Sequence, residues 1–469
     1  MKMRYGSGWV IGLMLLTLTT PVTGLAEPHG NDGAVFVMTG STDPARGNEV
    51  AMYRRDRSGD LTLLGFFPTG RLEANQPQFG AGPSPTTTLL GIPVPATADG
   101  HGSSNSLLLG ENRRCLFAVN AGSNTVSSFE AERDRLRLAS VVDSRGGLGA
   151  RFPVSIAVSG SRVYVLNSGD VGSVVGFDVR HECELTPIPG AARSLAGIAD
   201  SFPFPEPGEV LTTPGQISFS PDGRRLVVSI KGGDVPGPGF LPNGRMAVFP
   251  VGAGGQLGSR TVTPFDATAG RGGPFSFLFT DNHTLFVTHA NSQSVGTYRI
   301  NANNTLSLLS GPLLTGGLAP CWLDRKDDFV VVASFGGIPL VGAVPDGNGR
   351  LDVYRLNRDG TAGSTGKSFD YPAPGPGRSG NHAIDVRVAG DFLYFVQPRV
   401  GQVGRVTIER TGALTEPATF GGFAEGVEPF AGLNPGINDF LTRCFLQDAD
   451  ADNRSPECRR GSPQGIAGF

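Results

Sequence analysis

Seven times along the chain, a short run of β-branched, aromatic and aliphatic residues ends in a polar residue or glycine, and a second such run follows. Runs of this kind, bounded by turn residues, are typical of β-strands. Because the unit recurs and contains only strands, the pattern indicates a repeat architecture with one sheet per unit. The seven runs are residues 34–40, 115–122, 162–169, 225–232, 284–291, 329–336 and 392–399.

Three further strands accompany most of these runs. Each run after the first is preceded by a strand that starts with a small residue or proline, as at 153–158, and is followed by a third strand, as at 295–300. A fourth, less regular strand often opens with leucine after a polar turn, as at Leu61. Four strands in each of seven units predict an all-β fold, a seven-bladed β-propeller with four-stranded blades.

The first unit lacks a preceding inner strand, because residues 34–40 begin directly with the second-strand pattern. Residues 428–435 repeat the inner-strand start after the seventh unit. The sequence therefore predicts that this C-terminal segment completes the N-terminal blade and closes the ring. The expected organisation is a signal peptide at 1–26, the propeller at 27–435 and an irregular C-terminal tail at 436–469.

The N-terminal residues predict a secretory signal. Lys2 and Arg4 precede an apolar stretch at 9–18, and a small-x-small cleavage site ends at Ala26. The stretch is short for a membrane span, so we expect a secreted or periplasmic monomer with no span after cleavage, an uncleaved anchor being the alternative. The formal net charge is −3, which argues against nucleic-acid binding, because that requires a basic stripe on the surface.

Five cysteines in an exported chain allow two disulfides and one remaining thiol. Cys444 and Cys458 lie close together in a polar tail and are the predicted pair, whereas the partners of Cys115, Cys183 and Cys321 stay open. No CxxC motif and no zinc-ligand spacing occurs, so we expect no metal and no cofactor.

Polar residues recur where the second strands end and the inner strands start, two sets that meet at one mouth of a propeller's central channel. Amides, hydroxyls and one aromatic wall at such a mouth suit a small polar ligand. The candidate ligand-binding residues are Asn120, Asn167, Ser155, Gln216, Ser276, Trp322 and Gln397.

Two histidines, His289 and His382, occupy such positions, and Asp385 lies inside the last inner strand. Imidazole titrates near neutral pH, so these three residues are the candidate catalytic set. The alternative is structural: each histidine satisfies a hydrogen bond at a strand end, and the carboxylate belongs to a buried paired network.

The order of the motifs resembles the lactonase-type seven-bladed propellers. The resemblance covers nearly all of residues 34–435 and is carried by the segments 120–129, 152–170, 185–197, 215–229, 274–279 and 319–324. It implies a fold shared with phosphogluconolactonase-like and carboxymuconate-cyclase-like enzymes and with exported members of no assigned activity. Catalytic members carry histidines in an H-P-H-S inner-strand start, where this chain has Phe152-Pro153-Val154-Ser155.

Two functions remain open from the sequence. The first is an exported lactonase-like propeller that binds a small polar molecule, a glycan or a protein on the face that carries its long loops, without the usual catalytic set. The alternative is a lactone hydrolase or cyclase that uses the relocated residues His289, His382 and Asp385. The sequence leaves open whether the chain is an enzyme.

Overall fold

The computed structural model describes residues 32–39, 47–70, 87–89, 92–94, 101–132, 134–198, 213–232, 243–336, 349–371, 383–397, 401–421 and 463–469. They form β-strands joined by turns, with short 3-10 turns at His181–Cys183 and Ala290–Ser292. In this part of the chain, no helix is long and apolar enough to cross a membrane. The predicted signal peptide at 1–26 lies outside these ranges.

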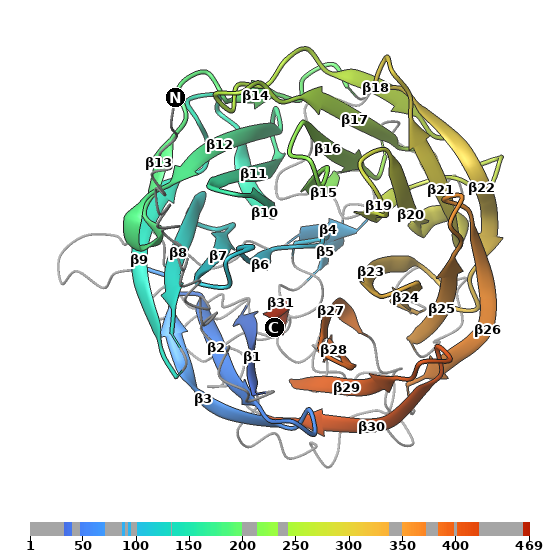
Figure 1. The fold of residues 1–469 in the computed structure, drawn as a ribbon. Coiled ribbons are helices and arrows are strands. Elements are labelled where there is room, and N and C mark those ends of the chain that lie inside the picture. Colours follow the sequence, from blue (N-terminus) through green and yellow to red (C-terminus); the bar gives the residue numbers. More distant parts are fainter. Residues whose placement is uncertain are drawn as a thin grey trace, which may run out of the picture. The chain divides into compact units, whose positions relative to one another are not determined.

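The described strands form seven antiparallel blades arranged in a ring, which confirms the predicted fold (Figure 1). The inner strands, from blade 1 to blade 7, are β31 (Pro463–Gly468), β6 (Leu107–Leu109), β10 (Arg151–Ser159), β15 (Pro214–Phe219), β19 (Pro274–Phe279), β23 (Pro320–Lys326) and β27 (Ile384–Ala389). The second strands are β1 (Gly33–Thr39), β7 (Cys115–Asn120), β11 (Arg162–Gly169), β16 (Arg225–Ile230), β20 (Thr284–His289), β24 (Phe329–Ser334) and β28 (Phe392–Gln397).

The third strands are β2 (Glu49–Arg55), β8 (Thr125–Ala131), β12 (Ser173–Val179), β17 (Arg245–Pro250), β21 (Ser294–Ile300), β25 (Arg350–Leu356) and β29 (Gln402–Ile408). The outer strands are β3 (Leu61–Pro68), β9 (Leu136–Asp143), β13 (Leu185–Pro187), β18 (Thr261–Pro264), β22 (Leu306–Leu314), β26 (Ala362–Asp370) and β30 (Leu414–Phe420), and β14 (Arg193–Ser194) also pairs with β12. A separate hairpin of β4 (Thr87–Leu89) and β5 (Ile92–Val94) lies in the connection between blades 1 and 2.

Burial explains why the second strands are the strongest signal in the sequence. Every residue of β7, β20 and β28 is buried, because neighbouring blades cover both faces of each sheet. A strand covered on both faces becomes a continuous apolar run and loses the alternation of a half-exposed strand. The outer strand β26 is mostly exposed or half-buried, and it is rich in polar residues and glycine, which explains the weaker pattern of the outer strands.

The ring closes through β31, which pairs antiparallel with β1 and places Ile466 opposite Val37. The prediction that residues 428–435 form this strand was wrong about the segment, since β31 occupies that edge of β1; residues 428–435 lie outside the described part. The prediction of an irregular tail at 436–469 was wrong for its last residues. The sequence of β31 is PQGIAG, and its glycines concealed it from a search for apolar runs.

The glycine at position 465 follows from close packing. A Cβ added there would lie 2.3 Å from the Ser106 hydroxyl oxygen and 3.1 Å from the Leu107 nitrogen, so a larger residue does not fit. Next to it, the Ile466 N–H donates to the Asp385 carboxylate at 3.2 Å. The closing strand is therefore fixed by contacts with blades 2 and 7 as well as by its pairing with β1.

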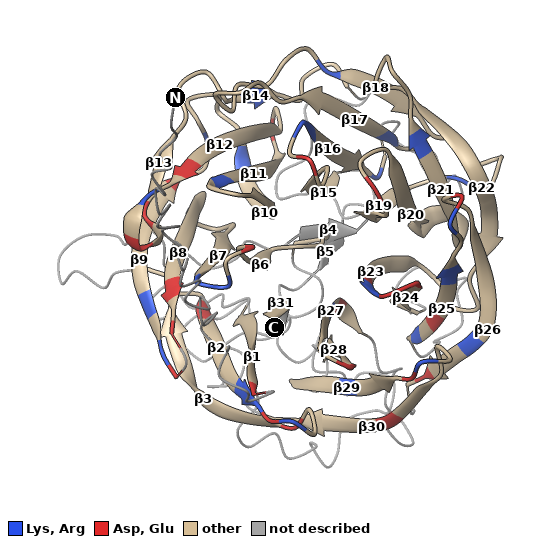
Figure 2. Cartoon of the chain, viewed as in Figure 1, with Lys and Arg blue, Asp and Glu red and all other residues tan. Residues whose placement is uncertain are grey.

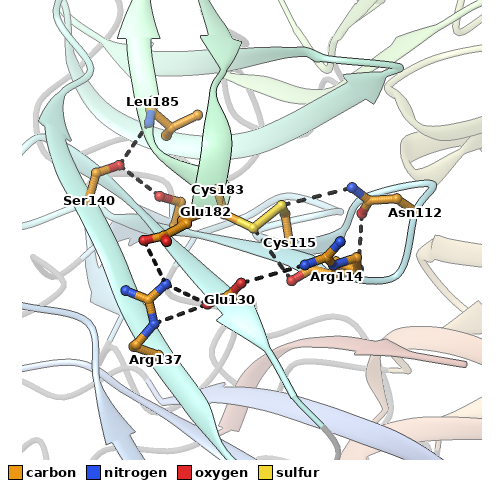
Figure 3. Close-up of a disulfide and its surroundings, with 10 residues drawn as sticks. Asn112, Arg114, Cys115, Glu130, Arg137, Ser140, Glu182, Cys183 and Leu185 are labelled. Atoms are coloured by element: carbon orange, nitrogen blue, oxygen red, sulfur yellow. Dashed lines mark hydrogen bonds and ion pairs between the residues drawn. A yellow bond between two sulfur atoms is a disulfide. The ribbon is translucent and has the colours of Figure 1, made fainter.

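A disulfide joins Cys115 at the start of β7 to Cys183 in the turn before β13, and so links blades 2 and 3 (Figure 3). Their Cα atoms are 5.4 Å apart and 68 residues separate them in sequence. Cross-linking a loop of this size stabilises a fold by about 4 kcal/mol in the chain-entropy model. The predicted partners Cys444 and Cys458 lie outside the described residues.

Candidate functional site at the centre of the ring

We use the term looped face for the side of the ring on which second strands end and third strands begin. In antiparallel blades, the connections from one blade to the next leave from this same side. Long sequence insertions at 71–103, 198–213, 233–243, 337–348 and 371–380 all join strand ends on the looped face, as does the connection 421–462 from β30 to β31. The predicted site residues lie at the inner edge of this face.

Residues 101–106, which we call the plug, cross the centre of the ring before entering β6 (Figure 1). All of them except Asn105 are buried. The plug meets distant blades: its Ser104 N–H donates to the Gly215 carbonyl in blade 4 at 3.1 Å, and its Asn105 side-chain oxygen accepts from the Arg387 guanidinium in blade 7 at 3.0 Å. The chain itself therefore fills the channel here.

Four consecutive carbonyls of the plug accept hydrogen bonds from other blades. The Lys231 ammonium of blade 4 donates to the Gly102 carbonyl, and the Trp322 indole N–H of blade 6 donates to the Ser103 carbonyl at 2.9 Å. The Ser104 carbonyl accepts from the Ser155 hydroxyl of blade 3 at 2.7 Å, and the Asn105 carbonyl accepts from the Ile156 N–H at 2.9 Å.

Two of the predicted ligand-binding residues, Ser155 and Trp322, thus meet at the plug. Two others, Gln216 of blade 4 and Ser276 of blade 5, bind one another: the Ser276 hydroxyl donates to the Gln216 side-chain oxygen at 2.6 Å. The Gln216 amide also donates to the Phe277 carbonyl at 2.7 Å. These bonds join neighbouring inner strands.

The predicted amide ligands Asn120 and Asn167 bind other parts of the chain: Asn120 bonds within blade 2, and Asn167 joins blade 3 to the residue that follows the last strand of blade 2. The Asn120 amide donates to the hydroxyls of Thr125 and Ser127, and the Asn167 amide donates to the Ser144 carbonyl at 2.7 Å. Gln397 is buried at the end of β28. The side-chain oxygens of Asn120 and Gln397 have no hydrogen-bond partner in the described part of the chain.

His289 is fully buried in blade 5, with hydrogen bonds at both ring nitrogens. Its Nδ1 pairs with the Ser294 hydroxyl and its Nε2 with the Tyr298 hydroxyl, each at 2.8 Å. Burial lowers the pKa of His289 to about 3, and the Arg271 guanidinium adds to the shift. At neutral pH the imidazole is therefore uncharged and holds Ser294 and Tyr298 in place.

The other members of the predicted catalytic set lie elsewhere. His382 is outside the described residues. Asp385 is buried in β27, where its carboxylate accepts from the Val386 and Ile466 N–H groups. Among the described residues, His289 thus orders blade 5 while Asp385 anchors the closing strand.

Sequence reasoning missed the plug and two of its donors, Lys231 and Arg387. Residues 101–106 read HGSSNS, a polar stretch without strand periodicity. The available signal for Lys231 was its position directly after the apolar run 226–230, where a buried cation needs nearby oxygen atoms. In the described ranges, no three His, Cys, Asp or Glu side chains gather as a metal-binding group.

A cleft of about 680 Å³ lies on the opposite face, between blades 6 and 7. Lys326, Arg355 and Arg410 line it together with Asp327 and Glu409. Figure 2 shows the same interspersion of acidic and basic residues around the ring. The walls of the cleft thus carry both signs of charge.

Residues 104–311 match the family described as Lactonase, 7-bladed beta-propeller. This part of the chain is similar to the lactonase-type seven-bladed β-propellers. The match spans blades 2 to 5 and confirms the resemblance derived from the motifs.

Solved structures agree with this fold over most of the chain. The periplasmic gluconolactonase of Pseudomonas aeruginosa is 17% identical, with 93% of this chain and 99% of that chain covered at a TM-score of 0.58. A putative 6-phosphogluconolactonase of Bacteroides uniformis is 14% identical, with coverage of 94% and 100% and a TM-score of 0.58. At such identities the likeness establishes the fold alone. The comparison with curated proteins gives no match.

Proposed function

We propose that this chain is an exported lactonase-like propeller that binds a small polar molecule, a glycan or a protein on its looped face without hydrolysing a lactone. The observation that carries the proposal is the plug. At the mouth of the channel, where a substrate of a propeller enzyme would enter, Trp322 and Ser155 of inner strands and Lys231 at the end of a second strand direct hydrogen bonds onto the chain's own backbone.

The chemistry at the H-P-H-S position supports the same proposal. Phe152 and Val154 replace the two histidines, and both are buried. The Val154 carbonyl accepts from the Ser103 hydroxyl at 2.8 Å, while Ser155 donates to the plug. None of these groups titrates near neutral pH, so this position offers no general acid or base for opening a lactone ring.

A relocated catalytic base at His289 is disfavoured by its surroundings. The ring has no exposed surface, and both nitrogens already have hydroxyl partners. Accepting a proton from water requires one of these bonds to break and a charge to form in a buried site, which is costly.

Export is part of the proposal. The N-terminal sequence has the features of a secretory signal, and the Cys115–Cys183 disulfide fits an oxidising compartment. The similar Pseudomonas aeruginosa structure belongs to a periplasmic protein, which is consistent with this placement.

The test is hydrolysis of a panel of sugar and aromatic lactones by purified protein, with an active lactonase as the positive control for the assay. We expect the rate to equal that of buffer alone for every lactone. The proposal fails if wild type hydrolyses any lactone faster than buffer does; the correctly folded variant His289→Gln then shows whether His289 takes part. Thermal shift with the same lactones and with a set of neutral oligosaccharides then measures binding without turnover.

A further inference from the structure

The contacts of the plug have the character of ligand recognition. Every donor that reaches it from blades 3, 4 and 6 binds a main-chain carbonyl, and Gly102, Ser103, Ser104 and Asn105 each contribute one. Blade 4 also accepts the Ser104 N–H through the Gly215 carbonyl. The ring thus recognises the backbone of a short peptide segment.

The backbone shape of the plug makes this possible. Gly102 and Asn105 have φ angles of 57° and 62°, in the left-handed region that glycine and asparagine tolerate best. In a regular strand, successive carbonyls point alternately to two sides. The two left-handed residues redirect the carbonyls, so that consecutive ones reach donors on three different blades.

The groups that bind the plug are held in place by their own packing. The Trp322 ring lies between Phe275 and Phe335, with centroid distances of 5.4 and 6.1 Å. The Lys231 ammonium lies 5.0 Å above the Phe275 ring, which stabilises a cation that is almost fully buried. Fixed donors of this kind lower the entropic cost of binding a peptide.

Side chains of the plug also form contacts: the Ser103 hydroxyl donates to the Val154 carbonyl at 2.8 Å, and the Asn105 side-chain oxygen accepts from Arg387 at 3.0 Å. The Ser104 hydroxyl has no hydrogen-bond partner among the described residues. Gly465 of the closing strand packs so closely on Ser106 that a Cβ there would lie 2.3 Å from the hydroxyl oxygen. Ser103, Ser104 and Ser106 are each at most 5% exposed, so a much larger side chain at these positions would overpack the centre of the ring.

We propose that the centre of the ring is a binding site for a short peptide of small residues whose backbone includes left-handed turns, and that residues 102–105 of the same chain occupy it as a self-ligand. Lys231, Trp322 and Ser155 are its main-chain-binding groups. The proposal deepens the proposed function, because it names what occupies the central site. It stands apart from the question of turnover, since the lactone panel measures catalysis and the experiments below measure peptide binding.

The first experiment disrupts the backbone of the self-ligand, residues 102–105, and leaves the donors Lys231, Trp322 and Ser155 unchanged. Ser104→Pro removes the N–H that binds Gly215, and the proline ring is incompatible with the neighbouring contacts. We expect a lower melting temperature and faster amide hydrogen exchange across 102–106. The synthetic peptide His-Gly-Ser-Ser-Asn-Ser, added to this variant, should raise the melting temperature in a saturable way, and a peptide with leucine at both central serines should not.

Two results overturn the proposal. One is wild-type exchange protection of residues 102–106 in Ser104→Pro. The other is a loss of that protection with no response to the peptide.

A second pair of variants serves if Ser104→Pro does not fold. Trp322→Phe keeps an aromatic ring in the inner strand and removes the indole N–H, so exchange in the plug should accelerate by roughly tenfold, as expected for one lost hydrogen bond. The matched control is Ser104→Ala, which removes a hydroxyl that has no hydrogen-bond partner in the described part of the chain and should leave exchange unchanged. Unchanged exchange in Trp322→Phe contradicts recognition of the backbone.

Discussion

Burial determines what His289 can do. The residue sits at the end of a second strand, where the sequence places a candidate base, but the fold encloses it with Phe265, Ser294 and Tyr298. The position was predictable because the strand is a clear apolar run. The orientation was not, because Ser294 and Tyr298 lie on the next strand and neither stands out as its partner in the sequence.

The lowered pKa of His289 predicts that stability depends on pH. The ordinary value near 6.5 applies to the unfolded chain, and the folded value is about 3, so the unfolded state binds the proton first as pH falls. The contribution of neutral His289 to the free energy of unfolding is fully present above about pH 6.5 and is lost progressively toward pH 3. At about pH 4.5 the loss is roughly 3 kcal/mol. Urea unfolding at a series of pH values measures this loss.

The control is His289→Gln, which keeps a polar side chain but cannot titrate. Its free energy of unfolding should fall less steeply between about pH 6.5 and pH 4.5 than that of wild type. Equal slopes for the two proteins would show that His289 is not held neutral in the fold.

At the scale of elements, β31 is the piece that the rest of the ring cannot replace. It forms the inner strand of blade 1. Its Ile466 N–H donates a hydrogen bond to the Asp385 carboxylate, and its Gly465 packs against Ser106. Without it, the edge of β1 and the pocket of Ile466 lose their partners. The sequence predicted that a C-terminal strand closes the ring, but it did not identify which one, because PQGIAG carries a single large aliphatic side chain.

Deletion of residues 463–469 should therefore destabilise the chain severely, with loss of a cooperative melting transition. Asp385→Ala should have a smaller effect, a loss of about 1–3 kcal/mol, because it removes the acceptor of the buried Val386 and Ile466 N–H groups. Circular dichroism melting compares both with the exposed control Asp391→Ala. A deletion variant that melts like the full chain would mean that another segment closes the ring.

At the scale of the whole molecule, the repeat was readable because blade packing buries each second strand on both faces. Seven blades and the looped face follow from that pattern alone. The contacts at the centre of the ring could not be predicted from the sequence in the same way. Trp322 and Ser155 were identified as lining the channel, but their partner is HGSSNS, whose fold depends on donors more than a hundred residues away, such as Lys231.

The central claim is that the plug fills the channel and covers Trp322, which is 1% exposed. Acrylamide quenching of tryptophan fluorescence in a Trp9→Phe background measures this directly, because Trp322 is then the only tryptophan. We predict weak quenching and blue-shifted emission for this protein, and markedly stronger quenching after Ser104→Pro is added. Strong quenching before that change would show an open channel and contradict the claim.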